Sequence, residues 1–136
     1  MTRLTSRIRS SWRLVAICVV VAAPGCAGPD KRLHDTATAL SSINATTRAV
    51  GQAWTERNAS TAYTLAALDQ ALRLTEAQRA DLLHDAALQS DSTGMRLVAH
   101  AEQLEHSLIE LTSAVKRSDG DRVRRELNRL SIAPAE

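Results

Sequence analysis

The spacing of apolar residues between positions 97 and 115 limits the fold most, because it repeats every seven residues. Alternating steps of four and three place all of these residues along one side of an α-helix. The preceding stretch, residues 90–94, combines Ser, Asp, Thr and Gly, which favours a loop. We therefore expect a long helix that runs from this loop to about residue 117. The apolar positions of the repeat are Leu97, Ala101, Leu104, Leu108, Leu111 and Val115.

Helical periodicity also covers most of the chain between residues 31 and 131. From Lys31 to Arg57 the stripe is only half apolar, because Thr36 and Thr47 occupy two of its positions. We expect the helices to break near residues 58–60, 74–75, 90–93 and 118–120. The break at 74–75 decides whether residues 59–89 form one helix or two, and the sequence leaves both arrangements open.

The composition excludes most other architectures. Five Gly and three Pro are too few for a turn-rich all-β sandwich, and two Cys exclude a disulfide-dense scaffold. With no Phe, two Trp and one Tyr, any core must be aliphatic. We predict an all-α fold, a small antiparallel bundle of four to five helices formed by residues 31–136. The residues expected in its core are Leu97, Leu104, Leu108 and Leu111, with Trp54 or Tyr63 packed near them.

The N-terminal segment differs from the rest of the chain. Four arginines precede residue 14, and the run from Leu14 to Ala23 has no polar side chain. This order is typical of a secretory signal peptide. The run is also shorter than the about 20 apolar residues that a membrane-spanning helix needs. We predict that residues 1–25 are a signal peptide, with an uncleaved N-terminal anchor as the alternative.

The end of this segment, Ala22-Ala23-Pro24-Gly25-Cys26, resembles the lipobox of bacterial lipoproteins. In that family a small residue, here Gly25, precedes a Cys that is lipidated and becomes the mature N-terminus. The resemblance implies that Cys26 carries lipid and that residues 26–30 form the lipidated Cys and a short tether. Ordinary cleavage after Ala27 is the competing interpretation.

Removal of this segment changes the charge balance. Of 17 Lys and Arg residues, four lie in residues 1–26, whereas all 15 acidic residues follow. The remaining 13 basic and 15 acidic side chains give a formal charge of −2, although the whole chain has +2. Nucleic-acid binding needs a clear cationic excess, so we expect no nucleic-acid partner.

The segment Leu74-Thr75-Glu76-Ala77-Gln78 has two interpretations. Thr75 and Gln78 have the spacing of a capping box, which would start a new helix. The same segment resembles the Leu-Thr-x-x-Gln motif of small all-helical periplasmic stress chaperones and metal-resistance proteins. That resemblance implies a soluble periplasmic protein of the stress-chaperone or metal-sensing kind.

The ionisable residues form no catalytic or metal-binding motif. His106 shares a helix face with Glu102 and Glu110, one turn to either side. The Glu-x-x-His spacing of bundle metal sites is missing, because Gln103 stands three residues before His106. No Gly-rich phosphate loop or nucleophile elbow occurs either. We expect no enzyme, no cofactor and no metal site, and we identify no small-molecule substrate.

The C-terminal part holds the one local concentration of basic residues. Arg122, Arg125 and Arg129 fall on one face of the expected last helix, at steps of three and four. Such a face fits anionic lipid or an acidic partner. Alternatively, these arginines only solvate the helix and favour its C-terminal end through the helix dipole.

Two hypotheses about function follow from these features. The first is a lipid-anchored bacterial cell-envelope protein that faces the periplasm or the exterior. It would be held to a membrane by covalent lipid and would bind another envelope protein through helix packing. The second is the soluble periplasmic protein implied by Leu74–Gln78. The signal segment and the missing catalytic motifs favour the first.

Overall fold

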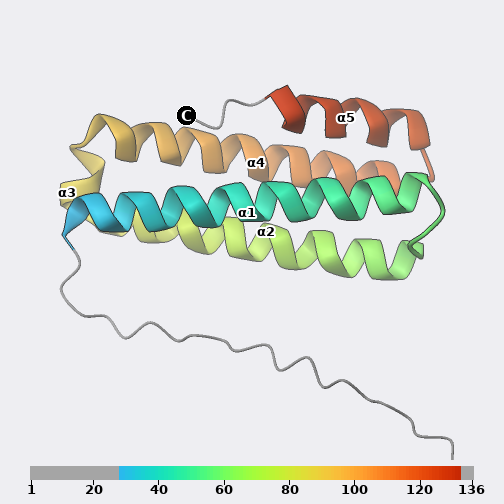
Figure 1. The fold of residues 1–136 in the computed structure, drawn as a ribbon, viewed down its shortest axis with the longest axis horizontal. Coiled ribbons are helices and arrows are strands. Elements are labelled where there is room, and N and C mark those ends of the chain that lie inside the picture. Colours follow the sequence, from blue (N-terminus) through green and yellow to red (C-terminus); the bar gives the residue numbers. More distant parts are fainter. Residues whose placement is uncertain (1–27, 133–136) are drawn as a thin grey trace, which may run out of the picture.

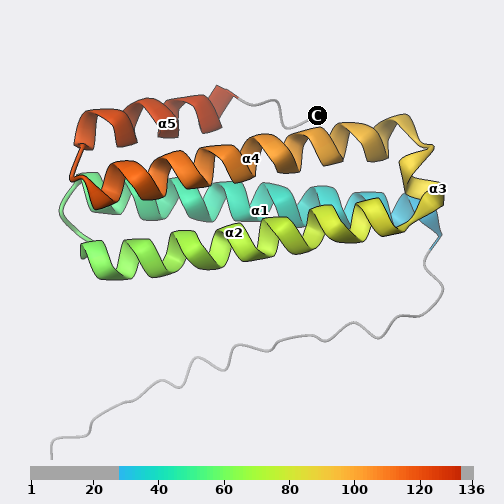
Figure 2. The same cartoon turned by 180° about the vertical axis from the view of Figure 1, so that it is seen from behind.

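The computed structural model describes residues 28–132, which form an all-α bundle (Figure 1). Three long helices lie side by side, and each runs antiparallel to the long helix that precedes it in the chain (Figures 1 and 2). The fold confirms the predicted all-α antiparallel bundle, whereas the predictions for residues 1–27 lie outside the described residues. The helices are α1 (Pro29–Thr55), α2 (Thr61–His84), α3 (Ala86–Gln89), α4 (Ser92–Lys116) and α5 (Gly120–Ile132).

The seven-residue repeat of α4 forms the centre of the core. Leu104, Leu108 and Leu111 are at most 2% exposed. Residues of α1, α2 and α5 complete the same cluster, among them Leu40, Leu68 and Val123. Trp54 packs against this cluster, as predicted for one of the two candidates, while Tyr63 is 61% exposed.

The prediction for Leu97 is only partly right, because this residue is half-buried and its neighbour Val98 is buried. Leu97 lies where two clusters of the core meet and packs against both of them. At the start of α4 the inward direction passes to Val98. This residue joins a second, smaller cluster with Leu33, Leu82 and Leu88.

The predicted helix break at residues 74–75 is wrong, because α2 continues without interruption from Thr61 to His84. Thr75 does not cap a helix: its side chain is fully buried, and its hydroxyl donates to the Ala71 carbonyl at 2.8 Å. A threonine that bonds back to the carbonyl four residues earlier is compatible with a helix interior. The Leu74–Gln78 segment is therefore an ordinary part of α2.

The other predicted breaks are confirmed, and side-chain caps mark them. Ser60 accepts from the amide of Tyr63 at 3.2 Å, and Asp91 accepts from the amide of Thr93 at 2.7 Å. Asp119 caps α5 by accepting from the amide of Arg122 at 3.0 Å. A further break at Asp85, which the sequence analysis missed, separates α2 from the single turn of α3.

The burial of the α4 repeat predicts a large effect of truncating Leu104. We expect Leu104→Ala to lower the free energy of unfolding by about 2–5 kcal/mol, because it removes buried methyl groups and leaves a cavity. Ile109 on the same helix is 54% exposed, so Ile109→Ala is the matched control and should change stability by less than about 1 kcal/mol. Urea unfolding of both variants measures the difference. Equal effects would contradict the assignment of the core.

The link between α3 and α4 depends on Gly94, the third residue of α4. A Cβ atom at this position would overlap the carbonyl oxygen of Leu88, which is backbone and cannot rotate away. We expect Gly94→Ala to lower the free energy of unfolding by about 1–3 kcal/mol through this overlap. A Cβ atom at Gly120 would have no other atom within 4 Å, so Gly120→Ala should leave stability unchanged or slightly raised. Urea unfolding of the two variants tests this ordering, and a neutral Gly94→Ala would contradict it.

Candidate anion-binding face

The three arginines predicted to form an anionic-partner face lie on α5. This helix turns back along α4 and begins at the end of the bundle remote from residue 28 (Figure 1). Val123 and Leu130 of α5 are buried and Leu127 is partly buried, all three packed in the main core. The spacing of three and four residues keeps Arg122, Arg125 and Arg129 on one flank of the helix.

Arg122 connects α5 to α4. Its guanidinium donates to the carboxylate of Glu110, and its side chain is 40% exposed. This hydrogen bond, followed by the positive charge of Arg122, holds the pKa of Glu110 below its usual value, although burial acts in the opposite direction. Arg122 thus stabilises the packing of the last helix more than it offers a free charge to a partner.

Arg129, unlike Arg122, pairs within its own helix, where it neutralises the buried carboxylate of Glu126. Its guanidinium lies 2.8 Å from Glu126, whose side chain is only 6% exposed, whereas that of Arg129 is 69% exposed. The burial of Glu126 was not predicted from the sequence. A signal was present, because Glu126 lies three residues after Val123 and four before Leu130 and thus at the edge of the apolar stripe.

Arg125 is the free cation of the predicted set. Its side chain is exposed, and within residues 28–132 it makes no ion pair or side-chain hydrogen bond. On the other flank of α5, Arg124 pairs with Asp121 at 2.5 Å and remains 61% exposed. The structure therefore brings the three predicted arginines to one flank and leaves one of them unneutralised.

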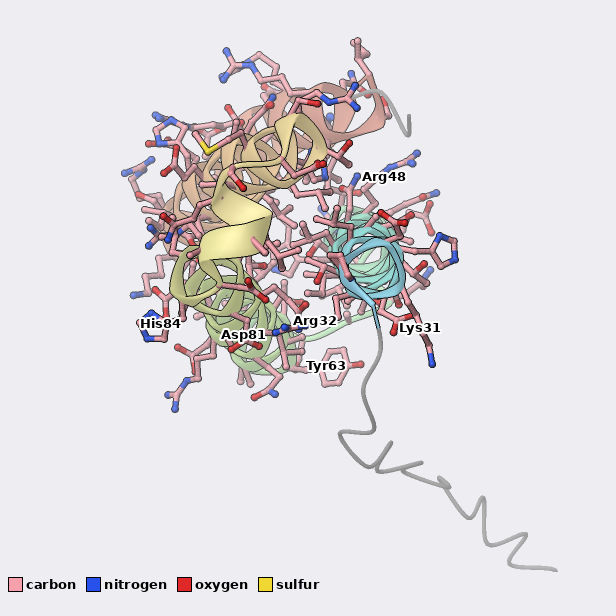
Figure 3. The ribbon with its side chains drawn as sticks, turned by 90° about the vertical axis from the view of Figure 1, so that its left-hand side faces the viewer. Lys31, Arg32, Arg48, Tyr63, Asp81 and His84 are labelled. Carbon is pink, nitrogen blue, oxygen red and sulfur yellow. The ribbon has the colours of Figure 1, made fainter. Side chains whose placement is uncertain are left out.

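A further arginine, Arg48 of α1, joins this region. The side-chain amide of Asn44 donates to the carbonyl of Leu130 at 3.2 Å, so this side of α1 faces α5. Arg48 lies one turn further along the same side of α1 and is exposed, and the end-on view shows it on the α5 side (Figure 3). The sequence alone could not place Arg48 here, because α1 and α5 are far apart in the chain.

The structure does not bring the histidines into a metal site within the described residues. Glu110, predicted to share a face with His106, is bound to Arg122 instead. No group of three or more His, Cys, Asp and Glu side chains in this part of the chain could hold a metal ion.

A hollow of about 190 Å³ lies at the opposite end of the bundle, between α1, α2 and α3. Arg32 at its edge pairs with Asp85 at 2.5 Å, and Figure 3 shows Arg32 and Asp81 close together in the view of this end. The lining residues are Arg32, Asp35, Thr36, Asp81, Leu82 and Leu88. The hollow is thus lined by charged side chains, of which Arg32 is engaged in an ion pair, and by the two leucines Leu82 and Leu88.

Comparisons with known proteins add no family to this description. No family model matches the chain, and neither a curated protein nor a solved structure matches it. Among the described helices, none combines the length and the hydropathy that a membrane span requires.

Arg129 pairs with a buried carboxylate and Arg125 does not, so substitution of the two residues should change the free energy of unfolding by different amounts. Arg129→Ala leaves the buried carboxylate of Glu126 without its ion-pair partner, so we expect the free energy of unfolding to fall by about 1–3 kcal/mol. Arg125→Ala is the matched control and should change it by less than about 0.5 kcal/mol. In the double variant Arg129→Ala/Glu126→Gln, part of the loss should return. Thermal or urea unfolding measures all three, and an Arg129→Ala variant as stable as Arg125→Ala would contradict the prediction.

Proposed function

We propose that this chain is a lipid-anchored bacterial cell-envelope protein whose helical bundle acts as a binding or assembly module. The observation that carries the proposal is the order of features before the bundle. A basic segment and an uncharged apolar run end at Gly25-Cys26, and α1 begins at Pro29, three residues after the cysteine. Lipid on Cys26 would therefore hold the folded domain directly at a membrane surface.

The short distance in sequence between Cys26 and the start of α1 supports a bundle that stays close to the membrane. A tether of three residues, 26–28, spans at most about 10 Å. Two or more acyl chains give stable membrane attachment, since each buried CH₂ contributes about 0.8 kcal/mol. The bundle would remain next to the bilayer, where a partner meets it at high local concentration.

The packing of α4 indicates which surfaces remain for a partner. Its seven-residue repeat is buried inside the chain's own bundle, with Leu108 and Leu111 fully buried. A partner would then use the outer faces of the helices, which carry most of the charged side chains. We therefore propose a binding role through charged outer surfaces, with no catalytic step and no cofactor.

The lipid anchor is tested by substitution of Cys26. In cells fed with a labelled fatty acid, we expect the wild-type protein to take up label and to fractionate with the membrane. Cys26→Ala should abolish the labelling, because no thiol remains to accept lipid. Cys18→Ala is the matched control, because Cys18 lies within the predicted signal peptide and should not affect labelling.

The opposite result is equally clear. A wild-type protein that takes up no label and has Gly28 as its mature N-terminus would contradict lipidation. Cleavage after Ala27 would then be correct, and a soluble periplasmic protein would become the better hypothesis.

A further inference from the structure

The positive charge of the described residues is concentrated in the last part of the chain. Residues 28–115 contain seven basic and eleven acidic side chains, a formal charge of −4. Residues 116–132, which hold the end of α4 and all of α5, contain six basic and three acidic side chains, a formal charge of +3. An anionic surface therefore attracts the α5 region and repels the rest of the molecule.

The solvent side of α5 also carries an apolar residue among its arginines. Ile132 is 78% exposed and lies two turns after Arg125, on the same side of the helix, and three residues after Arg129. The apolar face of α5 is buried in the bundle, so its contact with a membrane would rest on the arginines, which meet the headgroups, and on the one aliphatic side chain that can enter the interface. Arg124 and Arg48 extend the cationic surface toward α1.

We propose that the outer side of α5 docks on the anionic lipid surface of the membrane to which Cys26 anchors the chain. The bundle then lies along the membrane instead of standing upright on it. This inference rests on the lipid anchor of the proposed function and adds the orientation of the module. The docking surface consists of Arg48, Arg124, Arg125, Arg129 and Ile132.

The dimensions of the bundle permit this orientation. The 27 residues of α1 form a rod of about 40 Å, and packed helices lie about 8–10 Å apart. With residue 26 in the membrane, a tether of at most about 10 Å lets the start of α1 sit one helix diameter above the plane on which α5 rests. Both ends of the bundle can therefore reach the bilayer at the same time.

A lipid surface fits these side chains better than an acidic protein does. The arginines spread along both flanks of α5 and onto α1, and the hollow between α1, α2 and α3 includes none of them. A dispersed array of cations matches a plane of mobile anionic headgroups, which needs no fixed geometry. The attraction falls off over about 10 Å at 0.1 M salt, so it acts only when α5 lies close to the membrane.

The experiment uses the lipidated mature protein, residues 26–136, in vesicles, with an environment-sensitive fluorophore on Asn128→Cys. Asn128 is an exposed residue of α5. After lipidation of Cys26 and removal of Cys18 with the signal peptide, the new cysteine is the single free thiol. We expect a blue-shifted emission in vesicles of phosphatidylcholine with phosphatidylglycerol. Vesicles of phosphatidylcholine alone, or high salt, should abolish the shift.

Two variants separate docking from general effects of charge. Arg124→Gln/Arg125→Gln should remove the blue shift, and neither substitution touches the buried Glu126. Arg73→Gln/Arg96→Gln is the matched control, because it also removes two charges of exposed arginines, and it should retain the shift, since Arg73 of α2 and Arg96 of α4 lie outside the docking surface.

The outcomes distinguish the two proposals. A protein that floats with the vesicles but shows the same emission in both lipid compositions would overturn the docking of α5, and the arginines would then be assigned to an acidic protein partner. A double variant that shifts as much as the wild type would overturn it as well. A protein that does not float with either kind of vesicle would contradict the lipid anchor itself.

Discussion

The burial of one side of α4 is the interaction on which the rest of the bundle depends. Leu104, Leu108 and Leu111 are at most 2% exposed because α1, α2 and α5 each cover part of the same stripe. A chain without Phe cannot fill a wide interior, so its helices must approach closely around leucine, alanine and valine. The long helices α1, α2 and α4 and the shorter α5 all contribute to this aliphatic core.

Small and hydroxyl-bearing residues allow this close approach. Thr47 of α1 and Thr64 of α2 are at most 1% exposed, although both are polar. Gly51 of α1 lies so near Leu127 of α5 that a Cβ atom there would come within 2.7 Å of the leucine side chain. The half-apolar stripe of α1 is thus compatible with burial, because threonine and glycine occupy little volume between the helices.

The periodicity of apolar residues correctly predicted the features of the fold that depend on residues close together in the chain. The all-α class, the long helix with the seven-residue repeat and three of the four breaks follow from residues that are neighbours in the chain. The predicted break at 74–75 is wrong. The hydroxyl of Thr75 donates to the carbonyl of Ala71 within α2, so it does not cap the start of a new helix. Leu97 is less buried than predicted, because the second cluster of Leu33, Leu82 and Leu88 covers its neighbour Val98 at the start of α4.

The candidate face was predicted only in part, because its properties depend on tertiary neighbours. The sequence placed Arg122, Arg125 and Arg129 on one flank, but it gave no means to see that Glu110 of α4 binds Arg122. The proximity of Arg48 to α5 depends on the packing of the first helix against the last. Charge patterns can therefore be located from sequence, whereas the charges that remain free require the fold.

The most direct measurement is native-state hydrogen exchange of the amides in α4 at several protein concentrations. If the repeat is the internal core, the amides from Leu104 to Leu111 should be the slowest to exchange. Their protection should equal the global free energy of unfolding and should not change with concentration. Protection that rises with protein concentration would show that α4 pairs with a second copy. Fast exchange at the lowest concentration would contradict a core built on this helix.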